Sequence, residues 1–327
     1  MPQAITISQA KSAMLRRSEL SALGHTERQI RRAVETGEFV VVRRGWYIGG
    51  RIWRSLWPEG RHLLRVVAVH NDAVGALPIF CGPSAAVVHG FPLYRADLSR
   101  VHAATMRGAS RSAADVLRHE MAVADVDVVE VEGLLCTSPV RTVFDASRML
   151  SMEAAVAVAD AALGRVAVNW NVHDVDAAAA WKHDLRERAA ESSMRGIAQA
   201  RRVVEFADGR SQSAGESVSR LHLHRLGFRE IEIQVPIRLP GGDECWVDFG
   251  LDEVDAFGEF DGKGKYLDPA LRNGRSVAEV LLDEKRREDF IRGVTGRRFL
   301  RWKDEHIRTS RVLGARLRAF GVHPPGR

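Results

Sequence analysis

The chain is poor in cysteine and has no long apolar run, and these absences exclude several classes of protein. Its three cysteines, Cys81, Cys136 and Cys245, are far apart and form no CxxC pair, so neither a zinc knuckle nor a redox pair is indicated. They are expected to be buried thiols in a reducing compartment. No stretch approaches the roughly 18 apolar residues of a membrane span, and the opening residues lack a signal-peptide core. We therefore expect a cytoplasmic protein that does not contact a membrane.

The length and composition of the chain are typical of a globular protein, and no internal repeat is found. With 327 residues, 45% of them hydrophobic and 28% charged, it is expected to be globular and to form two or three domains. The net charge of +6 is uneven, since residues 1–60 hold ten Lys and Arg against five Asp and Glu. A local positive field attracts phosphate groups, so this segment is the first candidate for nucleic-acid contact. Ordinary solubilising charge is the alternative.

The N-terminal segment reads as two short helices, a basic third helix and a β-hairpin. Gly24 suits the end of the second helix and Thr26 the N-cap of the third, in which Ile30 and Val34 form a buried stripe. Residues 39–48 then read as two strands around a turn at 43–45. This is the order of a winged helix-turn-helix, in which the basic helix enters the major groove and the ribbon contacts phosphates. The expected DNA-binding residues are Arg28, Gln29, Arg31, Arg32, Arg43 and Arg44.

The same segment, SALGHTERQIRRAVETGEFVVVRRGWYI, resembles the N-terminal winged helix of abortive-infection-type (type IV toxin–antitoxin) antitoxins. The resemblance rests on an I-R-R helix followed by an R-R-G-x-Y wing. It implies DNA as a partner, together with a cognate toxin or a second copy of the chain. A helical hairpin used for protein contacts is the alternative.

The middle of the chain, residues 61–207, is expected to be an α+β connecting or interaction domain. Strands are predicted at 101–106, 116–120 and 126–131, followed by alanine-rich helices, and no catalytic constellation is found. The phrases CGPSAAVVHGFPL and TSPVRTVFDASR resemble the connecting region that follows the same winged helix in many actinobacterial proteins. His89 and His102 are interpreted as capping or half-buried residues, and Asp145 as the ion-pair partner of a neighbouring arginine.

Three carboxylates are expected to meet near the C-terminal hairpin of residues 245–266. Side chains alternate along a strand, so Glu259 and Asp261 share one face. If residues 252–255 form the turn, Asp248 falls opposite Glu259, with Cβ atoms roughly 5 Å apart. Carboxylates that close repel one another unless a divalent cation lies between them. The pattern predicts a Mg²⁺ or Mn²⁺ site with Asp248 and Glu259 as ligands.

The motifs VDF, GEFDGKGKY, EKRRED, RRFLRW and WKDEHI resemble the very-short-patch-repair-like branch of the PD-(D/E)XK nucleases. The resemblance implies a restriction-endonuclease-like mixed sheet flanked by helices, and cleavage of DNA. Glu216, in the first turn of the preceding helix, matches the family's helix-borne glutamate, which orients or completes the metal shell. Asp261 stands where the family usually has lysine, as it does in this branch.

The departure at position 261 leaves open which cation stabilises the reacting phosphate. Lys263 and Lys265 follow the strand, and Lys285 lies on the next helix. Val277 and Leu281 precede Lys285 at helical spacing, so Lys285 is expected on the stripe that faces the sheet. Lys285 is therefore favoured and Lys263 comes second.

These observations predict a multidomain α+β or α/β chain. Its parts would be a winged helix at 1–60, a connecting domain at 61–207 and a nuclease-like domain at 208–327. The expected function is DNA binding with metal-dependent hydrolysis of phosphodiester bonds, in phage defence, DNA repair or toxin–antitoxin control. One alternative is a non-catalytic antitoxin or transcriptional repressor with a degenerate nuclease fold. Another is a scaffold that binds a partner protein through its middle domain.

Overall fold

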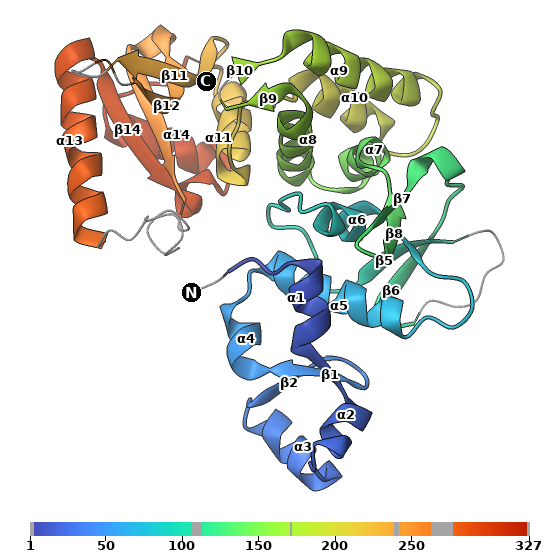
Figure 1. Cartoon of the computed structure of the whole chain (residues 1–327). Coiled ribbons are helices and arrows are strands. Elements are labelled where there is room, and N and C mark those ends of the chain that lie inside the picture. The colour runs from blue at the N-terminus through green and yellow to red at the C-terminus, as the bar shows by residue number, and fades with distance from the viewer. Residues whose placement is uncertain are drawn as a thin grey trace. The chain divides into compact units, whose positions relative to one another are not determined.

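Helices and strands alternate along the whole chain, which is a mixed α+β structure (Figure 1). The computed structural model describes residues 3–105, 113–170, 172–238, 242, 244–262 and 277–325, without the side chains at positions 277, 278, 280 and 281. It divides into two units, one formed by Met1–Ser151 with Asp184–Arg201 and the other by Met152–His183 with Arg202–Arg327. Among the described residues, no helix is both long and apolar enough to span a membrane.

The first unit begins with three helices and a small antiparallel sheet of order β1-β3-β2. These elements are α1 (Ile7–Ala13), β1 (Met14–Arg16), α2 (Arg17–Ala22), α3 (Glu27–Glu35), β2 (Phe39–Arg43) and β3 (Trp46–Gly49). Thr26 starts α3, as predicted: its Oγ1 accepts from Gln29 N, and its own N donates to Gln29 Oε1. Ile30 and Ala33 are buried, whereas Val34 is only half-buried, so the inward stripe follows i,i+3 rather than the predicted i,i+4 spacing.

A five-stranded mixed sheet of order β6-β5-β4-β8-β7 follows in the same unit. Its elements are α4 (Gly50–Ser55), α5 (Pro58–Asn71), β4 (Ile79–Phe80), α6 (Gly82–Val88), β5 (Val101–Thr105), β6 (Val116–Glu120), the short 3₁₀ turn η1 (Asp125–Asp127), β7 (Val128–Val131), β8 (Leu134–Thr137) and α7 (Pro139–Met149). The pairs β5/β6 and β4/β8 are parallel, and β4/β5 and β7/β8 are antiparallel. The three strands predicted for this segment are present, but the third starts at Val128 rather than at 126, and position 106 lies outside the described residues.

Polar side chains of this unit are paired as expected. Asp145 is fully buried and accepts from Arg141 Nε at 3.0 Å and from Arg148 Nη2 at 3.3 Å, which confirms its interpretation as an ion-pair partner. His89 is the C-cap residue of α6, and its Nε2 lies 2.7 Å from the carbonyl of Thr137. His102 is half-buried.

The second unit is built on a four-stranded sheet of order β11-β12-β13-β14. The remaining elements of the chain are α8 (Met152–Ala167), β9 (Val168–Asn169), β10 (Val172–His173), α9 (Val175–Ala190), α10 (Ile197–Phe206), α11 (Ala214–Arg225), β11 (Ile231–Arg238), β12 (Glu244–Leu251), η2 (Asp252–Val254), β13 (Ala256–Asp261), α13 (Val277–Thr295), β14 (Arg298–Lys303), η3 (Asp304–Ile307) and α14 (Ser310–Ala319). The pairs β11/β12 and β12/β13 are antiparallel. The pair β13/β14 is parallel and is connected through α13.

Helix α8 belongs with α11 in this second unit, although the predicted division at residue 207 assigned it to the connecting domain. A buried ion pair between Asp160 of α8 and Arg220 of α11 joins the two helices. The sequence boundary and the observed division into two units therefore differ in this region.

Trp302 of β14 fixes α11 against the sheet. Its fully buried ring lies against Gly258, where an added Cβ would come within 2.2 Å of the ring. The indole Nε1 donates to Ser219 Oγ of α11 at 2.8 Å, which satisfies the buried N–H. The absence of a side chain at Gly258 thus allows the contact that holds α11, and with it Glu216, beside the strands.

Candidate functional site

Strands β12 and β13 separate at the position of Asp248 and Glu259. Their ladder ends where Phe249 faces Gly258, and β12 then continues along β11 while β13 continues along β14. The turn at 252–255 forms as predicted, but Asp248 and Glu259 lie one step beyond the last paired residues, so the ladder does not include the pairing predicted between them. Asp248 Oδ2 accepts a hydrogen bond from Phe260 N at 2.8 Å. Asp248 therefore satisfies a backbone N–H at the fork in the sheet.

Glu216 lies in the first turn of α11 and is buried, with 7% of its surface exposed. Its Oε1 accepts from Ser213 Oγ at 2.8 Å, and its Oε2 accepts from Gln212 N at 2.8 Å and from Gln234 Nε2 at 3.1 Å. Burial, followed by the negative charge of Asp248, raises the pKa of Glu216 from 4.5 to about 8. Burial and the charge of Asp248 thus both favour the protonated form of the Glu216 carboxyl.

Glu259 is buried between two guanidinium groups. Arg287 of α13 binds its Oε1 through Nη2, and Arg301 of β14 places Nη2 3.1 Å from its Oε2. Arg301 is the direct neighbour of Glu259 in the parallel ladder. Arg287 points inward and also donates to the carbonyl of Trp246 at 3.1 Å. Sequence reasoning missed both arginines.

Lys285, the lysine that the sequence favoured, does not occupy this position. Lys285 is exposed, so the expectation that it lies on the sheet-facing stripe is wrong. The less exposed positions of α13 include Glu284, Arg287 and Ile291, spaced by three and four residues, and Lys285 is rotated out of that row. Lys263 lies outside the described residues, as does Lys265.

A charged cavity of about 580 Å³ adjoins the site at Asp261 and Arg301. Arg301 Nη1 lies 3.7 Å from Asp261 Oδ1, and its guanidinium also pairs with Glu284 at 3.4 Å and Glu288 at 3.1 Å. The cavity is lined by Asp261, Glu284, Lys285, Glu288, Asp289, Arg292, Arg301 and Lys303. Its charges of both signs are extensively paired with one another.

Of the three carboxylates, Glu216 and Asp248 are the two best suited to hold a divalent cation. Asp248 disfavours the ionised form of Glu216, and a cation between the two carboxyls would offset that effect and replace the proton of Glu216. Both oxygens of Glu259 are held by guanidinium groups, so Glu259 must release one of them to become a ligand. Within the described part of the chain, no three His, Cys, Asp or Glu side chains are arranged to hold a metal.

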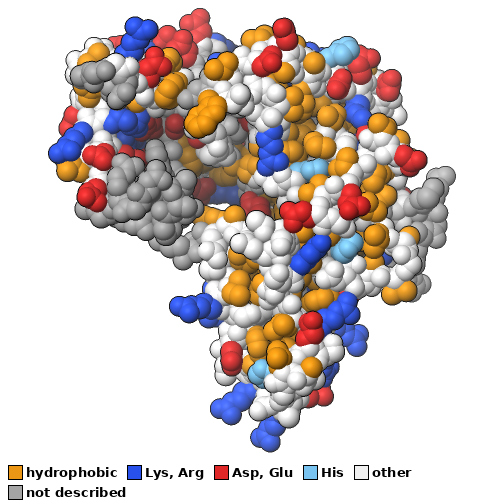
Figure 2. Space-filling model, viewed as in Figure 1, with side chains coloured by type: hydrophobic (Ala, Val, Ile, Leu, Met, Phe, Trp, Pro, Cys, Tyr) orange, Lys and Arg blue, Asp and Glu red, His pale blue; other side chains and the backbone are white. Residues whose placement is uncertain are grey.

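The first unit carries the predicted basic helix. Arg28, Arg31 and Arg32 are exposed on α3, and no ion pair to them is found among the described residues. Figure 2 shows basic side chains, with a few acidic ones, projecting from the part of this unit where α3 lies. Gln29 is exposed, but its side-chain oxygen accepts hydrogen bonds from Thr26 in the helix cap.

The two arginines predicted for the hairpin turn differ in their surroundings. Arg43 lies within β2, half-buried, and its Nε is 2.9 Å from Asp115 Oδ2 and 3.7 Å from Asp72 Oδ2. The expectation that Arg43 belongs to the turn is therefore wrong, because β2 extends one residue further than predicted. Arg44 is exposed and does lie in the turn, before Gly45.

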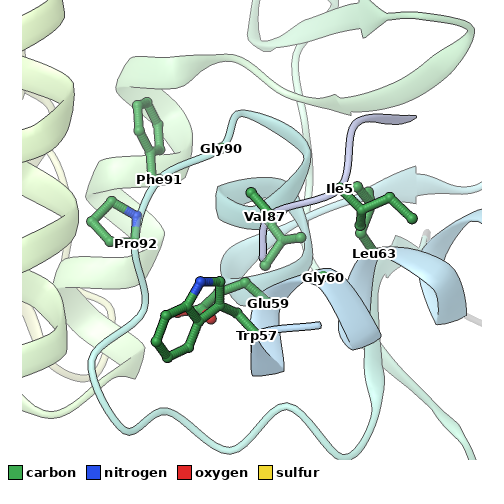
Figure 3. A pocket seen from close by; sticks show the side chains of 10 residues that line it. Ile5, Trp57, Glu59, Gly60, Leu63, Val87, Gly90, Phe91 and Pro92 are labelled. Carbon is green, nitrogen blue, oxygen red and sulfur yellow. The ribbon is translucent and has the colours of Figure 1, made fainter. Parts of the chain in front are cut away.

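An apolar cavity of about 350 Å³ lies in the same unit (Figure 3). The side chains of Ile5, Trp57, Val87 and Phe91 line it, and Glu59 is the one charged residue of its lining. Glu59 Oε1 accepts from the backbone N of Leu93 at 3.3 Å. This cavity offers no group of side chains that could act together as acid, base or nucleophile.

Comparison with known proteins finds two relatives of unassigned function. No family model matches the chain. The uncharacterized protein MT2308 of Mycobacterium tuberculosis (strain CDC 1551 / Oshkosh) is 27% identical over 263 residues, covering 76% of this chain and 90% of the relative. The uncharacterized protein Rv2248 of strain ATCC 25618 / H37Rv gives the same identity and coverage. The chain is thus similar along most of its length to a mycobacterial protein whose name states no activity.

Proposed function

We propose that this chain binds DNA through an N-terminal winged helix and hydrolyses DNA phosphodiester bonds at a metal-dependent PD-(D/E)XK-type site in its second unit. The observation that carries the proposal is that Asp248 acts on buried Glu216 of α11 and, together with Glu259, directly follows the last paired residues of the β12/β13 ladder. The order of elements supports it, with a helix, three antiparallel strands, a crossover helix and a parallel fourth strand. The residues come from three elements that are separate in sequence.

The DNA-binding part of the proposal rests on the first six elements of the chain. Their order is helix, strand, helix, helix and hairpin, with the first strand beside the last in the sheet. Exposed Arg28, Arg31 and Arg32 on α3 suit the major groove and its flanking phosphates, and Arg44 in the hairpin turn suits a backbone phosphate. Gln29 and Arg43 would contribute less, because both already bind protein groups.

Mg²⁺ or Mn²⁺ is the cofactor we propose, and it would be held by Asp248 and by Glu259 once Glu259 releases one of its guanidinium partners, with Glu216 completing or orienting the shell. When bound, such an ion neutralises charge developing on phosphate and lowers the pKa of a bound water. Arg287 and Arg301 carry the positive charge that position 261 lacks, and they hold the carboxylate of Glu259 in place. A phosphate that approaches the fork would meet these two guanidinium groups. Lys263 remains the lysine candidate.

The test is cleavage of plasmid and of single-stranded oligonucleotides with Mg²⁺ or Mn²⁺. We expect the wild type to cut at least one substrate, and Asp248→Asn and Glu259→Gln each to lose the activity. Asp252→Asn, in the turn of the same hairpin, is the matched control and should cut normally. Absence of cleavage by the wild type, or unchanged cleavage by both variants, would reject the nuclease function.

A second candidate function is a non-catalytic antitoxin or repressor that keeps the nuclease-like fold. The observation that favours it is the double ion pair on Glu259, which occupies both oxygens of a proposed metal ligand. It predicts sequence-selective DNA binding that survives Asp248→Asn and Glu259→Gln but is lost in the double variant Arg31→Ala/Arg32→Ala. Its partners would be DNA and either a cognate toxin or a second copy of the chain. Footprinting with these variants separates the two candidates.

A further inference from the structure

Gln234 has a backbone conformation that is rare within a strand. Its φ is +55°, although it lies inside β11. The other described non-glycine residues with positive φ are Arg95, Glu132, Trp170 and Asp255, and each of them lies in a turn. A left-handed backbone costs a residue with a Cβ roughly 1–2 kcal/mol. Such conformations persist where the surroundings hold them in place, and they cluster at functional sites.

The strained residue lies directly opposite Asp248. The β11/β12 ladder pairs Ile233 with Phe249 and Val235 with Val247. The intervening positions, Gln234 and Asp248, are absent from that ladder, which is otherwise continuous from 231 to 238. The break in β11 thus coincides with the fork between β12 and β13, and the two irregularities meet at Asp248.

The side chain of Gln234 reaches the helix glutamate. Its Nε2 donates to Glu216 Oε2 at 3.1 Å, and the same oxygen accepts from Gln212 N at 2.8 Å. Ser213 Oγ holds the other oxygen of Glu216 at 2.8 Å. Gln234 binds Glu216 from the sheet, whereas the Gln212 backbone and the Ser213 side chain lie just before the first turn of α11.

We propose that Gln234 is a positioning residue of the carboxylate site, whose left-handed backbone directs its carboxamide at Glu216 and fixes that carboxylate beside Asp248 for divalent-cation binding. This inference rests on the proposed metal-dependent function. It gives the strained backbone at position 234 a role. In a regular strand the side chain at this position would point to the sheet face opposite that of its two neighbours, without a left-handed residue. Hydrogen-bond partners that orient metal ligands typically change metal affinity by about 10–100-fold when removed.

Two substitutions separate the carboxamide from the backbone. Asparagine adopts left-handed backbone readily but is one methylene shorter, so Gln234→Asn keeps the conformation and does not reach Glu216. Gln234→Gly accepts positive φ without strain and removes the side chain. Arg238→Ala, on the exposed end of the same strand, is the matched control.

The experiment measures Mn²⁺ affinity by electron paramagnetic resonance and calorimetry, and thermal unfolding of the metal-free protein. Both Gln234 variants should unfold within about 1.5 °C of the wild type, a shift of about 1 kcal/mol for a chain of this size. Both should bind Mn²⁺ about tenfold or more weakly than the wild type, and Arg238→Ala should bind normally.

Three results would overturn this inference. Wild-type Mn²⁺ affinity in both Gln234 variants overturns the inference and leaves the proposed nuclease function in place. Loss of folding stability in both variants, in proportion to the decrease in affinity, shows that the carboxamide is structural and also overturns it. A wild type that neither binds Mn²⁺ nor cuts DNA rejects the proposed function, and the inference falls with it.

Discussion

Arg220 of α11 and Asp160 of α8 form an ion pair in which neither side chain is more than slightly exposed. Arg220 Nη2 lies 3.0 Å from both carboxylate oxygens of Asp160, and its Nη1 donates to the carbonyl of Phe206 at 2.7 Å. The guanidinium also lies over the Phe206 ring, 4.0 Å from its centroid. Burial raises the pKa of the Asp160 carboxyl. The contacts of Arg220 with Asp160 and Phe206 anchor α11, the helix that carries Glu216, to α8 and to the end of α10.

The first prediction concerns this pair. Asp160→Asn leaves the Arg220 charge buried without its partner, so we expect the free energy of unfolding to fall by about 3–5 kcal/mol. Replacing both partners, as Asp160→Leu with Arg220→Met, should recover most of that loss because no buried charge remains. Urea unfolding of Asp160→Leu, Arg220→Met and their double variant measures the coupling. Simple addition of the two single effects would contradict the prediction.

The second prediction compares two helical glycines of the same unit. Gly215 of α11 faces Phe260, and an added Cβ would lie 1.9 Å from its ring, whereas Gly293 of α13 has no neighbour within 4 Å. Gly293→Ala should stabilise by about 1 kcal/mol through helix propensity. Gly215→Ala should destabilise by about 1–3 kcal/mol, since Phe260 must move.

Denaturant unfolding and nuclease assays on both variants test this comparison. Because Gly215 precedes Glu216 and Phe260 follows Glu259, Gly215→Ala should also impair any activity of the site. Gly293→Ala should leave that activity unchanged. Equal stability changes in the two variants would show that the contact between Gly215 and Phe260 is not tight.

The third prediction is loss of stability in mild acid. Burial lowers the pKa of His62 to about 4, and His62 is enclosed by Ser84 Oγ at 2.8 Å and the carbonyl of Leu98 at 3.0 Å. Between about pH 6.5 and 4 the unfolded histidine binds a proton that the folded one does not. The stabilisation is therefore complete above pH 6.5 and falls with pH by up to about 1.4 kcal/mol per unit.

Denaturant unfolding at a series of pH values measures this slope. Burial also lowers the pKa of His102 to about 4, so its contribution has the same sign. His62→Gln should give a shallower pH dependence than the wild type, whereas His323→Gln, at an exposed position, should not change it. A wild-type slope in His62→Gln would count against the burial argument.

The fourth prediction concerns the salt dependence of DNA binding. Binding to each phosphate releases counterions, so the slope of log affinity against log salt changes by roughly one for each phosphate that the protein no longer neutralises. Arg44→Ala, which removes an exposed arginine at the hairpin turn, should reduce the slope by about one while keeping sequence preference. Arg43→Ala should change the slope less, because Arg43 is paired with Asp115 and Asp72. Titration by fluorescence anisotropy at several salt concentrations measures both.

The elements that sequence predicted best are those specified by local chemistry. Thr26 with Gln29 forms a capping box, and strand alternation around a fixed turn was enough to bring Asp248 and Glu259 to the same level. These features depend on residues three and eleven positions apart, so their pattern is visible in the chain itself.

What the sequence did not reveal depends on partners that are distant in the chain. To identify Arg287 rather than Lys285 as the inward residue, one must know how α13 is rotated about its axis. An error of two residues moves a side chain to another face of the helix. The left-handed backbone of Gln234 has no local signal, because glutamine in a strand pattern predicts ordinary β conformation. The assignment of α8 to the second unit depends on Asp160 and Arg220, which are 60 positions apart.

The parallel pairing of β13 with β14 has a consequence for biosynthesis. Glu259 and Arg301 are neighbours only after the crossover through α13 has been completed. A nascent chain released before Lys303 would carry β13 as a bare strand edge, open to pairing with another molecule. Premature stops or proteolysis within α13 should therefore produce aggregating fragments rather than a shortened, soluble protein.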